Sequence, residues 1–401
     1  MDAPIWHHLI MEKRTARKDV LMATAPMVQC RNDGVRRFAR EAGWNLIDLS
    51  RLVGGTAGLG GWRGDGALVT LRNDSETVLF AKRLRRAGVP VVDISNQRPE
   101  IRIPRVCLDN IAVGRMAAEH FAERNYRNAA WFSTYWTNIQ MERFAGFEEA
   151  WRSGGADSKP GPRRWILCES IPASRQNDQR AVARWFEKIL RAAPKPLALL
   201  CHCGEDASRV LAECRMLGIA VPEDIAILSA GDYVGLCGVQ STPISSVGIA
   251  GERHGYEAAA LLQRLMDGEP PPRSPILISP DPISVRASTD HTASADPLVA
   301  RALALIDINL GRTWGVAQLA SELGVQVLKL ERHFRDDLGR TPGDEILRRR
   351  IAMAQKLLRE TDLALNAIAT RCGFCHASYL SNRFRWATGL SPSLWRSRAR
   401  T

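Results

Sequence analysis

The last hundred residues of the chain contain one helical pattern twice. Residues 316–334 pair two short amphipathic segments across Gly324, and residues 365–384 repeat the arrangement across Gly373. A glycine between two helices permits the tight turn of a helix-turn-helix unit, whose second helix can lie in a DNA major groove. Two such units in one segment predict an all-α domain that binds double-stranded DNA.

The charge of the chain agrees with a polyanionic partner. The formal net charge is +12, and residues 297–401 hold 17 Lys or Arg against 9 Asp or Glu, an excess of +8. A basic domain on a less basic body is typical of proteins that bind nucleic acid.

Cysteine usage and hydropathy indicate the compartment. Nine cysteines at irregular spacing favour reduced thiols over a disulfide scaffold. No apolar run approaches 18 residues without charge, and the first residues lack the apolar core of a secretory leader. We therefore expect a cytoplasmic protein with no membrane partner.

The first 290 residues alternate strand-like and helix-like segments. Apolar runs typical of buried strands lie at residues 19–24, 44–49, 66–71, 89–94, 106–109, 129–133, 197–201 and 225–229. Helical spacing is found at residues 33–41, 76–87, 112–123, 141–153, 205–217 and 251–266. This alternation predicts an α/β fold with two doubly wound lobes and a ligand cleft at the carboxyl ends of the strands. We expect a sensor body at residues 1–290, a linker at 291–296 and a helical domain at 297–401.

Specific residues of the tail match a known domain. They are Leu319, Ala320, Gly324, Leu330, Arg332 and Phe334 in the first unit, and Ile368, Ala369, Cys372, Gly373, Phe374, Ser378, Tyr379, Leu380, Ser381, Phe384, Arg385 and residues 388–392 in the second. Through these residues, and through the connecting residues 348–358, the tail resembles the DNA-binding domain of AraC/XylS-type regulators. Trp395 stands where that family usually has Tyr.

The body carries a second resemblance. Its matching segments are residues 109–110, 114–121, 142–147, 218–224, 245–247, 255–262 and 286–290. In these segments the body is similar to the xylose-operon activator family, which joins a LacI-like periplasmic-binding-protein fold to an AraC-type tail. The resemblance implies an activator with a two-lobed sensor and a small-molecule effector of the sugar class.

Four residues are predicted to bind the effector. Asp109, Arg143, Cys203 and Asp232 lie after or near the carboxyl ends of predicted strands, and Arg143 matches a ligand-gripping arginine of the resembling sensors. Those sensors usually carry Asn-Asp at the position of Cys203 and Gly204, and Asp-Asn at the position of Gly231 and Asp232. This chain has therefore lost part of a site for sugar hydroxyl groups.

The second helix of each unit is predicted to contact DNA. Outward-facing candidates are Gln326, Leu328, Lys329, Glu331 and Arg332 in the first unit, and Ala377, Ser378, Ser381, Asn382 and Arg383 in the second. Residues expected to pack inward are Val327, Leu330, Phe334, Tyr379, Leu380 and Phe384. Arg332 and Asn382 are the favoured base contacts, because Arg can bridge guanine and Asn can bridge adenine. Lys329, Arg383 and Arg385 are candidates for phosphate contact, which carries no sequence information.

Two cysteine motifs suggest other chemistry, but neither predicts a cofactor. Residues 372–376 match the Cys-x-x-Cys-His attachment pattern of c-type haem. However, Gly373 and Phe374 fall at the turn of the second unit, and Cys372 falls on an apolar helix face. Residues 201–203 read Cys-His-Cys, for which small residues lining a pocket are favoured over a metal site. We therefore expect no cofactor and no bound metal.

The sequence as a whole predicts a DNA-binding transcription regulator rather than an enzyme, because no Ser/His/Asp or Cys/His set has a recognisable nucleophile context. The expected partners are operator DNA, a small-molecule effector, a second copy of the chain in a homodimer and, as a further candidate, RNA polymerase. Two alternatives remain open. One is an enzyme-derived α/β domain fused to a DNA-targeting tail, and the other is a ligand-independent DNA-binding protein.

Overall fold

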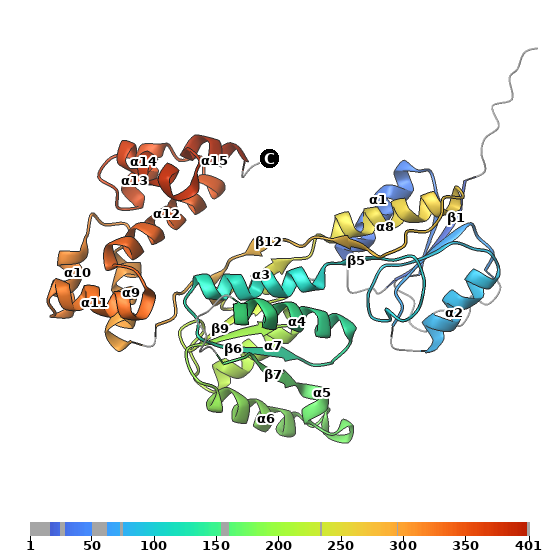
Figure 1. Ribbon diagram of the computed structural model, residues 1–401, viewed down its shortest axis with the longest axis horizontal. Helices are drawn as coiled ribbons and strands as arrows, with labels where there is room; N and C mark the ends of the chain where they lie inside the picture. The colour runs from blue at the N-terminus through green and yellow to red at the C-terminus, as the bar shows by residue number, and fades with distance from the viewer. Residues whose placement is uncertain are drawn as a thin grey trace, which may run out of the picture. The chain divides into compact units, whose positions relative to one another are not determined.

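In the computed structural model the chain forms two compact units (Figure 1). The first unit contains Met1–Ala122, Asn128–Ala193 and Leu197–Asp290, and the second contains Glu123–Arg127, Pro194–Pro196 and His291–Thr401. The longest segment of the second unit begins at the first residue of the predicted linker. The structure describes residues 17–24, 29–49, 62–72, 75–153, 160–232, 235–294 and 296–398.

The first lobe of the first unit is a four-stranded parallel sheet in the order β2-β1-β3-β4. Its strands are β1 (Asp19–Ala23), β2 (Asn45–Asp48), β3 (Gly66–Val69) and β4 (Val91–Asp93). Its helices are α1 (Gln29–Glu41), α2 (Ser75–Arg86) and α8 (Gly251–Met266). Successive strand residues point to opposite faces, so Val20 and Met22 pack with the α1 and α8 side chains, whereas Leu21 packs with Phe80 of α2. Helices α1 and α8 lie side by side on one face (Figure 1).

The second lobe contains a six-stranded sheet in the order β12-β10-β9-β8-β6-β7, in which β12 is antiparallel to β10 and the other pairs are parallel. Its strands are β6 (Asn128–Ser133), β7 (Arg163–Ile166), β8 (Leu197–Cys201), β9 (Ile225–Ser229), β10 (Ser245–Gly248) and β12 (Asp281–Ser284). Its helices are α3 (Asn110–Glu123), α4 (Asn138–Ser153), α5 (Leu167–Ser170), α6 (Gln179–Ala192) and α7 (Gly204–Met216), with short 3-10 turns η2 (Ala173–Arg175), η3 (Cys237–Val239) and η4 (Ala287–Thr289). Phe132 packs with Phe186 of α6 on one face, and Trp131 packs with Phe144 of α4 on the other.

A short parallel ladder lies where the chain passes between the two lobes. Strand β5 (Val106–Leu108) pairs with β11 (Ile276–Ile278). The residues that follow β5 lead into α3 of the second lobe, and those that follow β10 lead back to α8 of the first. The predicted two-lobed α/β body is therefore present, with a crossing region at the carboxyl ends of β5 and β10.

Glycines allow helices to approach very closely in each lobe. A Cβ atom on Gly255 of α8 would lie 1.8 Å from the carbonyl oxygen of Arg31 in α1. A Cβ atom on Gly114 of α3 would lie 2.0 Å from the carbonyl oxygen of Arg143 in α4. No side chain fits at these distances, so both crossings require glycine.

The second unit consists of helices around two small cores. The helices are α9 (Pro297–Asn309), α10 (Val316–Leu323), α11 (Val327–Leu338), α12 (Pro342–Glu360), α13 (Leu365–Arg371), α14 (Ala377–Thr388) and α15 (Pro392–Arg398). Helix α12 contributes Ile346 to the core of the first helix-turn-helix unit. It also contributes Ile351, Ala354 and Leu358 to the core of the second. One continuous helix is therefore part of both predicted helix-turn-helix units.

A buried carboxylate holds the start of α12. Glu345 is fully buried and accepts hydrogen bonds from Arg340 (2.6 Å), Arg348 (2.7 Å) and Arg349 (2.7 Å). Arg349 also pairs with Asp307 of α9. Burial alone would raise the pKa of Glu345, but the hydrogen bonds and charges of Arg348 and the other arginines outweigh it and lower the pKa to about 2. The ionised carboxylate thus ties α12 to α9.

No helix among the described residues combines the length and the apolarity needed to cross a bilayer.

The glycine crossing of the first lobe leads to a prediction about stability. Replacing Gly255 with Ala should lower the free energy of unfolding by about 1–3 kcal/mol, because the new methyl group must push two helix backbones apart. Gly238→Ala is the matched control, since a Cβ atom there meets nothing within 4 Å. Urea unfolding followed by tryptophan fluorescence measures both variants. Equal stability of the two variants would contradict this packing.

The Glu345 cluster leads to a prediction about stability at low pH and after substitution of Glu345 by a neutral residue. Glu345→Gln leaves several arginines without their shared anion, and should lower the free energy of unfolding by about 3–5 kcal/mol. In the wild type the folded-state pKa lies below the ordinary value of 4.5. The stabilisation is therefore complete above pH 4.5 and is lost as the pH falls from about 4.5 towards about 2. Helical circular dichroism across urea and pH series measures this, with exposed Glu322→Gln as the control; an E345Q variant as stable as E322Q would refute it.

Candidate functional site

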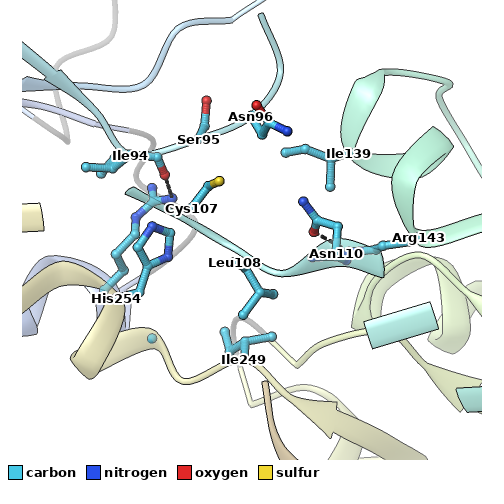
Figure 2. A pocket seen from close by; sticks show the side chains of 12 residues that line it. Ile94, Ser95, Asn96, Cys107, Leu108, Asn110, Ile139, Arg143, Ile249 and His254 are labelled. Carbon is cyan, nitrogen blue, oxygen red and sulfur yellow. Dashed lines mark hydrogen bonds between the residues drawn. The ribbon is translucent and has the colours of Figure 1, made fainter. Parts of the chain in front are cut away.

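A pocket lies between the two lobes of the first unit and is lined from both (Figure 2). The first lobe contributes α1, the start of α8 and the residues after β4, and the second lobe contributes the first turns of α3 and α4. Cys107 and Leu108 of β5 form the wall between them (Figure 2). The space measures about 420 Å³ when its opening to solvent is included.

Arg143 is held at the second-lobe side of this pocket. Its side chain is 1% exposed, although it carries a permanent charge. Its Nε donates to Oδ1 of Asn110 (3.0 Å), and its Nη1 donates to the carbonyl oxygen of His202 (2.9 Å). Asn110 begins α3 and His202 follows β8, so three elements orient one guanidinium group beside the pocket. Figure 2 shows Asn110 next to Arg143.

Glu142, the neighbour of Arg143 on α4, links the two lobes. Its carboxylate accepts hydrogen bonds from the amide groups of Asn138 (3.0 Å) and Asn110 (3.0 Å) in the second lobe, and of Asn96 in the first. Asn138 also donates to the carbonyl oxygen of Asn96 (2.8 Å). The lobes are therefore joined by hydrogen bonds at one side of the pocket.

The loop that carries Ser95 and Asn96 is fixed by a buried ion pair. Asp93, at the end of β4, accepts from Nε of Arg105 (2.9 Å) and from the backbone N–H of Ser95 (3.1 Å). Burial raises the pKa of Asp93, and the charge of Arg105 opposes this rise. A polar loop at the carboxyl end of a parallel strand is the expected place for ligand contacts in an α/β fold.

Arg31 and His254 come from the two helices that cross at Gly255. Nη1 of Arg31 donates to the carbonyl oxygen of Ile94 (3.2 Å), which lies directly after β4. Nε2 of His254 lies 2.9 Å from the carbonyl oxygen of Val106, so this nitrogen carries the proton. Both side chains line the pocket and are buried.

Burial holds two histidines and a thiol around the pocket in their neutral forms. Burial, and then the charge of Arg31, lowers the pKa of His254 to about 3. Burial, and then the charge of Arg143, lowers the pKa of His202 well below its ordinary value. Burial raises the pKa of the Cys107 thiol to about 12, so it is protonated at neutral pH. The pocket therefore presents positive charge and neutral hydrogen-bonding groups.

The four residues predicted to bind the effector are placed differently from one another. Arg143 lines the pocket, whereas Asp109, Cys203 and Asp232 are not among the lining residues. Oδ1 of Asp109 instead accepts from the backbone N–H of Ala112 (2.9 Å) at the start of α3. Cys203 and Asp232 lie at the carboxyl ends of β8 and β9, where Asp232 accepts from the backbone N–H of Cys237 (3.3 Å).

Sequence reasoning missed Arg31, Asn110 and His254 as pocket residues. Asn110 directly follows Asp109, the residue that the strand-end argument selected. Arg31 and His254 lie more than 200 residues apart and come together because α8 returns to pack against α1. No local pattern in the sequence signals that contact.

The second unit presents the predicted DNA-contact residues on two similar helices. In the first, α11, Gln326, Leu328, Lys329 and Arg332 are exposed, and Glu331 is half-buried beside Arg335. In the second, α14, Ser378 and Asn382 are exposed, while Ala377, Ser381 and Arg383 are half-buried. Between α13 and α14, Gly373 has a φ of 71°, and a Cβ atom there would lie 2.5 Å from the carbonyl oxygen of Arg312. That turn therefore requires glycine.

Two residues predicted to pack inward are exposed instead. Val327 is 37% exposed because it is the first residue of α11, before the helix turns towards its core. Tyr379 is 47% exposed, and its ring lies at the rim of the second core, where its hydroxyl oxygen accepts from Nε of Arg383 (3.2 Å). Leu330, Phe334, Leu380 and Phe384 are fully buried as predicted. Tyr379 and Arg383 therefore belong to the exposed side of α14.

The Cys-x-x-Cys-His motif divides between core and surface. Cys372 is buried in the core of the second helix-turn-helix unit, whereas Cys375 and His376 are exposed. Burial raises the pKa of the Cys372 thiol to about 11. Cys372 thus packs as a small apolar residue, as the apolar helix face suggested.

Comparison with known proteins agrees with these two units. Residues 118–289 match the family described as a periplasmic binding protein-like domain, and residues 319–398 match the family described as a helix-turn-helix domain. The xylose operon regulatory protein of Escherichia coli K12 is 26% identical over 342 residues, which are 84% of each chain. The corresponding protein of Haemophilus influenzae is 26% identical over 302 residues, 73% of this chain and 74% of that protein. A solved structure of a xylose-binding transcription activator superposes with a TM-score of 0.58 at 24% identity, over 96% of this chain and 99% of that one. These findings confirm the predicted fold class and resemblance.

The exposed face of α11 leads to a prediction about sequence readout. Arg332→Ala should weaken binding to the operator by about 1–3 kcal/mol, and random DNA much less, if its guanidinium contacts a guanine. Lys329→Ala should weaken both alike and flatten the salt dependence, because a phosphate contact carries no base identity. Fluorescence anisotropy with operator and random duplexes at several salt concentrations measures both variants. A binding-site selection on R332A that returns the wild-type motif with no position relaxed would remove Arg332 from base readout.

Proposed function

We propose that the chain is a DNA-binding transcription regulator that joins a periplasmic-binding-protein-like domain to an AraC-type double helix-turn-helix domain, and that its interlobe pocket binds the effector that controls it. The effector belongs to the sugars and their derivatives, the class for which the curated relatives are named. Its binding shifts the balance between two arrangements of the domains, and so changes affinity for operator DNA.

The strongest support for an effector site is the environment of Arg143. A buried, permanently charged side chain is costly unless hydrogen bonds and an ionic partner compensate it. Here Asn110 and the His202 carbonyl oxygen orient the guanidinium group at a pocket whose other wall belongs to the opposite lobe. A ligand in this pocket touches both lobes, which is what an effector needs in order to favour one arrangement of them.

The partners follow from the second unit. A single α11–α14 pair can read adjacent major-groove segments, and a homodimer would place two such pairs on two half-sites. We propose a homodimer that acts from the cytoplasm as an activator in contact with RNA polymerase. The ten predicted residues of α11 and α14 are the proposed DNA-contact set, and Asp109, Cys203 and Asp232 remain proposed effector contacts together with Arg143.

We propose that the α/β body senses its ligand without converting it. Burial, complete for Cys107 and Cys201 and partial for Cys203, raises the pKa of these three thiols, which leaves them in the protonated, weakly nucleophilic form. A metabolite panel incubated with the full chain and analysed for products tests this. Turnover of any member would favour the fused-enzyme alternative.

The proposed function predicts a separation of ligand response from DNA binding. Arg143→Met keeps an unbranched, flexible side chain but removes the guanidinium group and its charge, so effectors should no longer raise the unfolding temperature. In the wild type an effector at a hundred times its Kd should add about 2.7 kcal/mol of stability. Affinity for operator DNA in the absence of effector should stay within about twofold of wild type, a change under 0.5 kcal/mol.

Thermal unfolding with pentoses, hexoses and uronic acids, and gel-shift assays on the same samples, measure the two properties. Arg152→Met is the matched control, because Arg152 lies on the exposed side of the same helix. An R143M variant that still responds to effector would exclude Arg143 from the site.

A further inference from the structure

Helix α14 carries an aromatic side chain that is anchored at one end and exposed at the other. Tyr379 is 47% exposed, yet its ring meets the ring of Phe374 edge to face, with 6.0 Å between the ring centroids. Phe374 is 4% exposed and belongs to the core of the second helix-turn-helix unit. The core therefore holds the Tyr379 ring, while its hydroxyl group remains at the surface of α14.

Arg383, one helical turn after Tyr379, makes two contacts with it. Its Nε donates to the Tyr379 hydroxyl oxygen (3.2 Å), and the central carbon atom of its guanidinium group lies 5.4 Å from the centroid of the Tyr379 ring. The second distance is within the range of a cation–π interaction. Two contacts with one neighbour restrict the rotamers of a long side chain that would otherwise be flexible.

The contacts with Tyr379 leave one end of the Arg383 guanidinium group available. Its Nε is engaged, whereas neither Nη1 nor Nη2 has an acceptor within the described part of the chain. These two atoms form a planar pair of donors at a fixed spacing. The major-groove edge of guanine presents N7 and O6 as a pair of acceptors, which such donors match.

Helix α11 has different residues at the corresponding positions. The third and seventh residues of α14 are Tyr379 and Arg383, and those of α11 are Lys329 and His333. Nδ1 of His333 lies 2.5 Å from Oδ2 of Asp296, the N-cap residue of α9. The seventh position is therefore used inside the unit in α11, but belongs to the exposed side in α14. The two helices cannot contact DNA with the same set of residues.

We propose that Tyr379 is a positioning residue for sequence recognition, and that it fixes Arg383 for a paired contact with guanine in the major groove. Arg383 is then a specificity-determining residue rather than a phosphate contact. Asn382 is its exposed neighbour and the favoured adenine contact, so the part of the operator that faces α14 should contain guanine near adenine. This inference rests on the proposed function, because it takes α14 as a helix that contacts bases.

A fixed geometry matters more for a base contact than for a phosphate contact. Phosphate oxygens lie along the whole DNA backbone, so a flexible cation can reach one in many conformations. A paired contact with a base requires a defined orientation of the guanidinium plane, and ordering a free arginine for it costs side-chain entropy. The hydrogen bond to Tyr379 removes part of that cost before DNA binds. Its loss should therefore weaken guanine recognition and leave the general attraction to DNA unchanged.

The experiment uses the full chain and duplexes obtained by binding-site selection with the wild type. The guanine tested is the one at the position that Arg383→Ala relaxes in a parallel selection. Exchange of its base pair for each of the other three should lower wild-type affinity by about 5- to 150-fold, which corresponds to about 1–3 kcal/mol. Replacement by 7-deazaguanine, which lacks only the N7 acceptor, should cause part of this loss. Fluorescence anisotropy measures each duplex beside random DNA at several salt concentrations.

Variants separate the role of Tyr379 from that of Arg383. Arg383→Ala should remove the preference for guanine, and Arg383→Lys should weaken it, because lysine offers a point charge instead of a planar pair of donors. Tyr379→Phe keeps the ring and its contact with Phe374 but removes the hydroxyl acceptor. It should lower the preference for guanine by about two- to tenfold, the effect of one hydrogen bond, without changing affinity for random DNA. In the Arg383→Ala background the same change should have no further effect.

Two matched controls accompany these variants. Tyr135→Phe removes a hydroxyl group from a tyrosine that is 63% exposed in the first unit, and should leave DNA binding unchanged. Arg385→Ala removes an exposed arginine of α14 that is a candidate for phosphate contact, and should weaken binding to operator and random DNA alike. Helical circular dichroism and thermal unfolding report whether each variant is folded.

An equal loss of affinity for operator and random DNA in Arg383→Ala, with a smaller salt dependence, would overturn the proposal and make Arg383 a phosphate contact. A selection with R383A that relaxes no position, or relaxes one that is not guanine, would overturn it as well. A Tyr379→Phe variant with full preference for guanine would show that Tyr379 does not position Arg383. If the wild type prefers no duplex over random DNA, the proposed function itself fails.

Discussion

Close contact between helix backbones at glycine is the constraint on which the pocket depends. Each crossing places the carbonyl oxygen of a pocket arginine against a glycine of the facing helix, Arg31 against Gly255 and Arg143 against Gly114. The helix backbones that carry these two arginines therefore cannot shift towards the facing helices without a clash. This fixes where each guanidinium group reaches the pocket. A larger residue at either crossing would move the backbone that carries the guanidinium group. The contacts are reciprocal and involve Gly34 and Gly255 where α1 meets α8, and Gly114 and Gly146 where α3 meets α4.

The second unit uses much of its positive charge internally. Arg340, Arg348 and Arg349 bind the buried carboxylate of Glu345, and Arg350 donates to the carbonyl oxygens that end α9 and precede α10. The guanidinium nitrogens that donate to these protein oxygens are engaged inside the unit, while the charges of the arginines still add to its long-range field. The excess of +8 therefore indicates how strongly the unit is attracted to DNA at long range. It does not give the number of contacts between the unit and DNA phosphates. For short-range contact with DNA we propose residues whose polar ends are exposed, such as Lys329.

The sequence predicted those features that local periodicity determines. Helices α10 and α13 begin at residues 316 and 365, where the two predicted units begin, and each ends before the glycine predicted to form its turn. The sequence analysis did not predict strand β7 or helix α6. The first two residues of β7 are arginines and are exposed, and only its last two residues are buried, so no apolar run marks the strand. In the pocket, the strand-end rule located Asp109 but not Asn110, and it could not locate Arg31. Which residue of a turn faces a pocket depends on helix capping, and which helix faces it depends on packing between distant segments. Neither the capping geometry nor the packing of distant segments can be predicted from a short window of the sequence.

A ligand between the lobes can control the chain only through contacts that differ between two arrangements of those lobes. The hydrogen bonds from Asn96 and Asn138 that meet at Glu142 already join the lobes on one side of the pocket. A ligand that contacted Arg143 alone would bind every arrangement equally well and would shift none of them. A ligand that contacts Arg143 from the second lobe and Arg31 from the first adds its binding energy to the arrangement in which both are within reach. In the proposed mechanism, contacts to both lobes are therefore what would couple ligand binding to the arrangement of the lobes.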